Sequence, residues 1–254
     1  MINIILWKWR PHATFRGEAY EMTHANIMIN MIERNLDAEH RIVLVTDDPF
    51  GADSETFPLW EDHNKLNNAS GAHLPSCYRR LRIFDPATQL SMGIERGERI
   101  CSIDLDAVVI NKLDKLLVRK EKFIGWGVRG TYHPRVFNGS MFMFNAGDFS
   151  DIWKDFDPAR SPRMALASGF MGSDQGWLSY KLARRTDCAG WCWPEVASYP
   201  RETFRIRRLD VNNKIIFFHG RNKPWQPATI VQSPWIKRYY KKEQINDGAE
   251  LRIA

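Results

Sequence analysis

The chain has 254 residues, of which 44% are hydrophobic and 26% are charged, and its formal net charge is +6. This composition is that of a globular protein and excludes a disordered chain. No stretch approaches the roughly 18 apolar residues of a membrane span, and the short apolar start lacks the basic residues and cleavage site of a signal peptide. We therefore expect a cytoplasmic protein whose modest positive charge favours an anionic ligand such as a phosphate, a nucleotide or a nucleic acid.

The first part of the chain alternates between strand and helix patterns. Ile2–Leu6 and Ile42–Thr46 are apolar runs rich in β-branched residues, which predict strands. Between them, residues 18–36 carry apolar side chains at helical spacing. The order strand, helix, strand predicts an α/β protein built on a parallel sheet. Residues 50–75 are rich in Gly, Pro, Asn and His and predict a long irregular loop.

Further helices and strands are expected along the rest of the chain. The helices are predicted at residues 76–84 and 174–184, and the strands at residues 99–103, 107–110, 123–126, 140–144 and 215–219. No internal repeat or linker divides the sequence. We therefore expect a single domain over residues 1–254, with a core of about residues 1–225 and a C-terminal extension of residues 226–254.

Two carboxylates, Asp104 and Asp106, stand two residues apart inside the apolar stretch from Ile103 to Val109. Buried carboxylates are costly and neighbouring ones repel each other, so this pair needs a positive partner. In a strand, residues i and i+2 share a face, so their oxygens can converge on one point. Hard oxygen ligands suit Mg²⁺ or Mn²⁺. The pattern indicates a divalent metal site, and the alternative is a strand-end turn with two solvated aspartates.

Polar residues also follow the last expected strand. There, the imidazole of His219 can ligate Mn²⁺, Gly220 lets the backbone approach a ligand, and Lys223 can neutralise a phosphate. The alternative is a surface turn with a solvated lysine. Asp174 and Gln175 open the helix expected at 174–184 and are a third candidate site; the simpler alternative is helix capping, with Ser173 as the N-cap and an acidic first turn.

Taken together and in this order, the motifs resemble those of nucleotide-sugar glycosyltransferases of the GT-A fold. The resemblance is to family 8 in particular, which includes glycogenin and bacterial lipopolysaccharide galactosyltransferases. It extends over about residues 1–225. The segments that carry it are Tyr78-Arg79-Arg80-Leu81, Asp104-x-Asp106, Phe137-Asn138-Gly139-Ser140, Asp174-Gln175-x-x-Leu178 and Gly220-x-x-Lys223-Pro224-Trp225.

The resemblance implies a Rossmann-like GT-A fold, with a mixed, mainly parallel sheet flanked by helices. It also implies a metal-dependent enzyme that moves a sugar, with retention, from a nucleotide-diphosphate donor to an acceptor hydroxyl. The acceptor would be a glycan, a lipid-linked sugar or a small molecule. Retention leaves two routes open, a covalent intermediate on a carboxylate such as Asp174, or same-face attack with Gln175 as a polar contact.

The family's functional residues map onto this chain one by one. Asp104 and Asp106 would hold Mn²⁺ or Mg²⁺ against the donor diphosphate. The donor would be bound by Arg80, by Asn138 at the sugar, by Gly220, and by Lys223 at the diphosphate, while Asp174 and Gln175 would lie beside the transferring sugar.

The sequence departs from the family pattern at two positions. The family's metal-binding histidine stands where this chain has Phe217, and we predict that His219, on the same face of an extended strand, takes over as the third metal ligand. The family's Asn-(Ala/Ser)-Gly is here Asn138-Gly139-Ser140, which changes the expected sugar contacts.

Trp7 and Lys8 follow the first expected strand. Ligands of α/β sheets bind at the carboxyl ends of strands, so we predict the nucleobase there; aromatic packing in the core or at its rim is the alternative. Two other functions are compatible with the basic charge. One is a sugar transferase acting on modified bases of DNA. The other is a non-catalytic nucleotide- or nucleic-acid-binding module, which leaves Asp104 and Asp106 unexplained.

Overall fold

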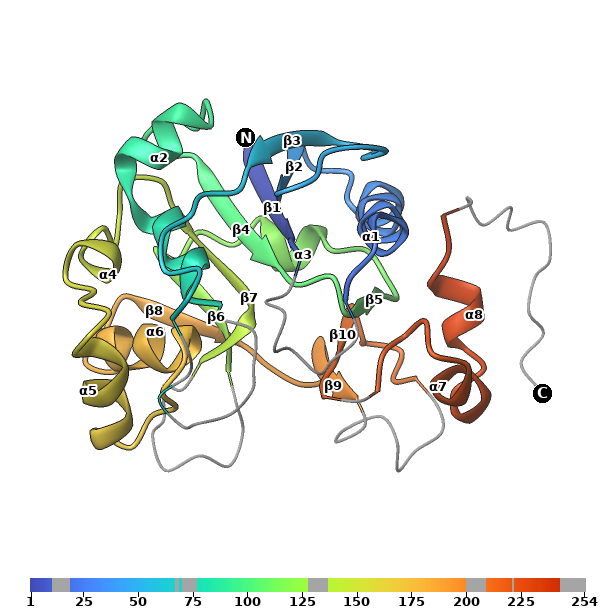
Figure 1. Cartoon of the computed structure of the whole chain (residues 1–254). Helices are drawn as coiled ribbons and strands as arrows, with labels where there is room; N and C mark the ends of the chain where they lie inside the picture. The colour runs from blue at the N-terminus through green and yellow to red at the C-terminus, as the bar shows by residue number, and fades with distance from the viewer. Residues whose placement is uncertain are drawn as a thin grey trace.

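The computed structural model describes residues 1–10, 19–66, 69, 77–127, 137–199, 209–220 and 222–242. There the chain forms a seven-stranded sheet with the order β3-β2-β1-β4-β7-β6-β8 and a three-stranded sheet with the order β5-β10-β9 (Figure 1). The strands are β1 (Ile2–Lys8), β2 (His40–Thr46), β3 (Glu55–Pro58), β4 (Arg99–Ile103), β5 (Ala107–Val109), β6 (Phe123–Gly127), β7 (Phe137–Asn145), β8 (Cys188–Trp191), β9 (Val196–Tyr199) and β10 (Ile215–Phe218).

The large sheet is mixed and mainly parallel. β1 pairs in parallel with β2 and β4, β2 with β3, and β6 with β8, while β7 runs antiparallel to both β4 and β6. All seven residues of β1 are buried, as expected for a central strand that is covered on both faces. The predicted α/β class with a mixed, mainly parallel sheet is confirmed.

Helices cover both faces of the large sheet. The helical elements are α1 (Met22–Asn35), the 3₁₀ helix η1 (Cys77–Phe84), α2 (Pro86–Ser91), α3 (Asp114–Leu117), α4 (Asp151–Lys154), α5 (Ser161–Ala167), α6 (Asp174–Leu182), α7 (Pro227–Gln232) and α8 (Ile236–Tyr239). Alternate residues of β1 enter two different cores. Ile4 and Leu6 pack in the core that includes α1, whereas Ile5 and Trp7 pack in the core that includes η1 and α6.

Two predictions of local structure differ from the structure. Residues 77–84 form a 3₁₀ helix in which six of the eight residues are buried. Its consecutive side chains Tyr78, Arg79 and Arg80 donate hydrogen bonds to three different parts of the fold, at Gly172, Trp60 and Asp174. The segment expected to be irregular contains the strand β3, which pairs with β2 at the edge of the sheet. β3 is only four residues long and its side chains are half-buried or exposed, so it lacks an apolar pattern. Residues 67–68 and 70–75 of this predicted loop lie outside the described residues.

The segments that carry the predicted site residues gather at one edge of the large sheet. This edge holds the carboxyl ends of β1 and β4, and also the start of β7, because β7 is antiparallel to β4. The described part of the C-terminal extension forms α7 and α8, and Ile236 of α8 is buried in the core that includes α1. Residues 243–254 lie outside the described part. Among the described residues, no helix combines the length and the apolar character needed to cross a membrane.

Candidate active site

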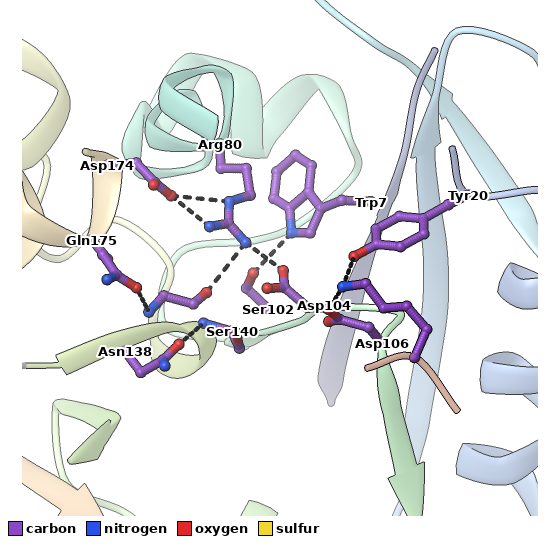
Figure 2. A network of polar contacts seen from close by, with 12 residues as sticks. Trp7, Tyr20, Arg80, Ser102, Asp104, Asp106, Asn138, Ser140, Asp174 and Gln175 are labelled. Atoms are coloured by element: carbon purple, nitrogen blue, oxygen red, sulfur yellow. Dashed lines mark hydrogen bonds and ion pairs between the residues drawn. The ribbon is translucent and has the colours of Figure 1, made fainter. Parts of the chain in front are cut away.

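Arg80 is the centre of the polar network at this edge (Figure 2). Its Nε and Nη2 donate hydrogen bonds to Oδ2 of Asp174, at 3.1 and 2.6 Å, and its Nη1 donates to Oδ1 of Asp104 and to the carbonyl oxygen of Gly139. The Arg80 side chain is 7% exposed. Because an unpaired buried charge is costly, the arginine and its two carboxylates depend on one another. Arg80 thus connects η1 with the loop after β4, with β7 and with α6.

Lys223 and Asp106 form a second ion pair at the same edge. Lys223 Nζ lies 2.5 Å from Oδ2 of Asp106 and 3.2 Å from the hydroxyl oxygen of Tyr20. The Lys223 and Asp106 side chains are 13% and 10% exposed. Gly220 has a φ of +64°, which a glycine adopts readily, and it begins the turn through which the chain leaves β10.

Asp104 and Asp106 lie in the bend that joins the two sheets. β4 ends at Ile103 in the large sheet and β5 begins at Ala107 in the small one, so the chain must turn between them. The two aspartates are therefore not consecutive residues of one strand face, and each pairs with a different cation, Arg80 or Lys223.

Burial dominates the electrostatics of the acidic pair. It raises the pKa of Asp104 to about 6; Arg80 opposes this rise, and the charge of Asp106 adds to it. Burial, followed by the charges of Asp106 and Asp104, also raises the pKa of the Tyr20 phenol, so Tyr20 is neutral at physiological pH. Burial disfavours the charge on Arg80, but Asp104 and Asp174 outweigh it and raise the pKa of Arg80.

The carboxylate oxygens of Asp104 and Asp106 are the type of ligand that hard divalent cations prefer. Each ion pair uses one carboxylate oxygen, Oδ1 of Asp104 and Oδ2 of Asp106, so each aspartate has a second carboxylate oxygen outside its ion pair. Mg²⁺ is commonly bound by one or two carboxylates together with substrate phosphates and water. Within the described residues, no group of three or more His, Cys, Asp or Glu side chains is arranged to hold a metal.

His219 has a stacking partner in this structure. Its ring lies 5.4 Å from the ring of Trp126, at an interplanar angle of 17°, and Phe217 stacks on the same tryptophan at 5.0 Å. His219 does not join Asp104 and Asp106 in a three-ligand group, so its role as third ligand stays a prediction.

Trp7 and Lys8 are the last two residues of β1, which extends two residues beyond the expected strand, and both are largely buried. Trp7 is 3% exposed, its indole N–H donates to Oγ of Ser102 at 2.8 Å, and its ring packs edge-on against Trp60. The structure therefore favours the core alternative for Trp7, and Trp9 next to it is the more exposed ring. Lys8 is 7% exposed, and among the described residues its ammonium group has no hydrogen bond or ion pair.

The start of β7 and the start of α6 are joined by hydrogen bonds. The Gly139 N–H donates to Oε1 of Gln175 at 3.2 Å, and Oδ1 of Asn138 accepts from the Ser140 N–H at 2.9 Å (Figure 2). A Cβ at Gly139 would lie 3.1 Å from Nη2 of Arg80 and from Cβ of Gln175. A glycine at this position therefore allows Arg80 and Gln175 to approach β7 closely.

Gly176→Ala is expected to lower the free energy of unfolding by about 1–3 kcal/mol, because overpacking forces the backbone to move. A Cβ at Gly176 would lie 1.6 Å from the carbonyl oxygen of Met171. The shift would also move Asp174, two residues earlier, away from Arg80. Urea denaturation measures the change. Gly190→Ala is the matched control, since the nearest atom to its Cβ would be 3.8 Å away; equal stability of the two variants would contradict the expectation.

Tyr20 is a member of this network that our sequence analysis missed. It lies two residues before α1, within no motif, and 203 residues from its partner Lys223. Its ring packs edge-on against Trp225 at 5.5 Å, and Trp225 stacks on His24 of α1 at 3.9 Å. Trp225 thus anchors the segment that carries Lys223 to the start of α1.

Comparison with known proteins shows which solved structures have a similar fold. No family model matches the sequence, and no match was found among curated proteins. Among solved structures, the chain is similar to the galactosyltransferase LgtC in complex with donor and acceptor sugar analogs, with a TM-score of 0.57, 12% identity, and coverage of 95% of this chain and 98% of that one. The structure of an active-site mutant of LgtC has a TM-score of 0.59 with the same identity and coverage.

A third similar structure is the apo form of the bifunctional glycosyltransferase WbbM, with a TM-score of 0.54 and 16% identity. The match covers 95% of this chain and 51% of WbbM, so the chain spans about half the length of that protein. These likenesses cover nearly the whole of this chain and agree with its mixed, mainly parallel sheet. The protein therefore has the GT-A fold, the fold of these glycosyltransferases.

Proposed function

We propose that this protein is a metal-dependent glycosyltransferase that moves a sugar from a nucleotide-diphosphate donor to a hydroxyl of an acceptor molecule. The observation that carries the proposal is the convergence of Arg80, Asp104, Asp106, Asp174 and Lys223 at one edge of a GT-A sheet. These side chains come from four separate segments of the chain, and they combine carboxylates with cations suited to a sugar diphosphate.

Breaking the bond between the sugar and the phosphate leaves negative charge on the diphosphate. Lys223, whose ammonium group is nearly buried, is the residue that would neutralise this charge. A divalent cation held by Asp104 and Asp106 would act as a Lewis acid on the same phosphates. Arg80 donates hydrogen bonds to Asp104 and Asp174, and its planar guanidinium would fix the orientation of both carboxylates beside the donor.

Asp174 and Gln175 would lie beside the transferring sugar. Oδ2 of Asp174 accepts two hydrogen bonds from Arg80, and such charge-assisted bonds lower the nucleophilicity of a carboxylate. This pairing supports the same-face route to retention over a covalent intermediate on Asp174. Gln175, held by the Gly139 N–H, would supply a polar contact to the sugar.

The acceptor is proposed to be a glycan, a lipid-linked sugar or a small hydroxyl compound. Support comes from the similar LgtC structure, which contains donor and acceptor sugar analogs. That likeness gives no comparable support for a nucleic-acid acceptor.

A screen of nucleotide sugars tests the proposal without knowledge of the acceptor. Thermal stability and slow donor hydrolysis would be measured with Mn²⁺, with Mg²⁺ and with EDTA. We expect one donor to stabilise the fold only with metal, by about 2.7 kcal/mol at a hundredfold excess over its Kd. If no donor stabilises the protein or is hydrolysed, the proposal is wrong, and a binding module is the next candidate.

A further inference from the structure

Asp106 already has a cation of the chain itself within ion-pair distance. Lys223 Nζ is 2.5 Å from its Oδ2, and both side chains are almost fully buried. Ion pairs of this kind are much less screened by salt than exposed ones. A divalent cation that binds Asp106 is therefore repelled by the positive charge of Lys223, which is paired with the same carboxylate.

Tyr20 keeps the Lys223 ammonium at this place. Its hydroxyl oxygen lies 3.2 Å from Nζ, and Nζ lies 5.4 Å from the centre of its ring. The Tyr20 ring is held edge-on by Trp225, which is stacked on His24. Because these aromatic rings belong to the start of α1 and to the segment after β10, contacts with the fold as well as the pair with Asp106 keep the ammonium group near Asp106 in the free protein.

A formal charge count extends the argument to the whole cluster. Asp104, Asp106 and Asp174 contribute three negative charges and Arg80 and Lys223 two positive ones, which leaves −1. A divalent cation alone would change this sum to +1 and lie close to two fixed cations. A nucleotide-sugar diphosphate, which is doubly negative, would restore the sum to −1. The cation and the diphosphate together therefore leave the formal charge of the cluster unchanged, whereas the cation by itself reverses its sign.

We propose that Lys223, positioned by Tyr20, is a built-in counterion of Asp106 that competes with a divalent cation in the free protein. When the donor binds, its diphosphate draws the ammonium group away from Asp106, so the cation and the donor bind cooperatively. In this scheme Tyr20 is a positioning residue that acts through Lys223. The inference rests on the proposed function, because it needs a diphosphate ligand.

The test is a titration with Mn²⁺ in which free Mn²⁺ is measured by electron paramagnetic resonance, without any turnover. Lys223→Met removes the charge and retains much of the apolar stem. We expect it to bind Mn²⁺ at least about tenfold tighter than the wild type, since two charges near 4 Å interact strongly even at an effective dielectric constant of 20. Unchanged or weaker binding of Mn²⁺ by folded Lys223→Met overturns the proposal.

Lys112→Met is the matched control. Lys112 also lies 2.5 Å from an aspartate oxygen, that of Asp37, but this pair is exposed. Removing the charge of Lys112 should leave the Mn²⁺ affinity unchanged. If Lys112→Met tightens binding as much as Lys223→Met, the effect is one of net charge and the proposal fails.

Tyr20→Phe is a second variant that removes one hydroxyl and leaves Lys223 charged. We expect it to tighten Mn²⁺ binding in the same direction but less than Lys223→Met, because the ammonium loses a partner but remains present. No change in Mn²⁺ affinity for a folded Tyr20→Phe variant would overturn its positioning role.

Adding ADP, CDP, GDP or UDP separates this inference from the proposed function. The wild type should bind Mn²⁺ more tightly with the matching nucleotide, and Lys223→Met should lose most of this gain. If the nucleotide and Mn²⁺ bind independently in the wild type, the proposed competition between Lys223 and Mn²⁺ for Asp106 is wrong, while the glycosyltransferase proposal stands. If none of the four nucleotides binds and the donor screen is also negative, both proposals are wrong.

Discussion

Asp106→Asn is expected to reduce metal-dependent turnover of the donor by at least about 10²-fold, the typical effect of removing a strong electrostatic contact in an active site. Asparagine has nearly the same shape, but it lacks the charge that pairs with Lys223 and that the proposed divalent cation would need. The measurement is the rate of donor hydrolysis with Mn²⁺ and with EDTA, alongside a thermal melt to show that the variant is folded.

Asp37→Asn is the control for this variant, because Asp37 also pairs with a lysine at 2.5 Å but is exposed and distant in sequence from the site segments. It should retain wild-type turnover. Full activity of Asp106→Asn, with metal still required, would contradict the assignment of Asp106 to the proposed metal site.

Arg80→Met is expected to lower the free energy of unfolding by about 3–5 kcal/mol, which is typical of removing one partner from a buried ion pair. Methionine fills part of the volume, but it leaves the carboxylates of Asp104 and Asp174 without their shared cation. Denaturation in urea at neutral pH measures the loss. Adding Asp174→Asn should recover part of it, since one of the two unpaired charges is then removed.

Arg82→Met is the matched control for this prediction. Arg82 belongs to the same 3₁₀ helix and also pairs with an aspartate, Asp62, but both side chains are about one-third exposed. Exposed ion pairs contribute about 0–1 kcal/mol, so the control should be only slightly destabilised. Similar losses for Arg80→Met and Arg82→Met would show that the buried cluster does not depend on Arg80.

Much of the large sheet could be predicted from the sequence because its central strands contain apolar runs. β1 and β2 are buried runs of β-branched residues, and α1 carries its buried side chains at helical spacing. The short strands β3, β8 and β9 were not predicted. Each has four residues and no clear pattern, and its backbone becomes a strand through pairing with a neighbour.

The acidic pair could also be identified from sequence, since two carboxylates in an apolar stretch require compensation by positive charge. The order of the motifs predicted the GT-A fold, which the solved structures support. The partners of these residues could not be predicted in the same way. The cost of burial shows that a counterion is needed, but it does not show which lysine or arginine provides it.

By itself, then, the sequence determined the α/β class, the central strands and the need for charge compensation at Asp104 and Asp106, because burial and periodicity are local properties of a chain. Tertiary structure alone decided that Arg80 pairs with Asp104 and with Asp174, that Lys223 pairs with Asp106, and that Tyr20 contacts Lys223. These contacts join residues up to 203 positions apart. They form because the carboxyl ends of β1 and β4 and the start of the antiparallel β7 meet at one edge of the sheet, where buried charges must find opposite charges.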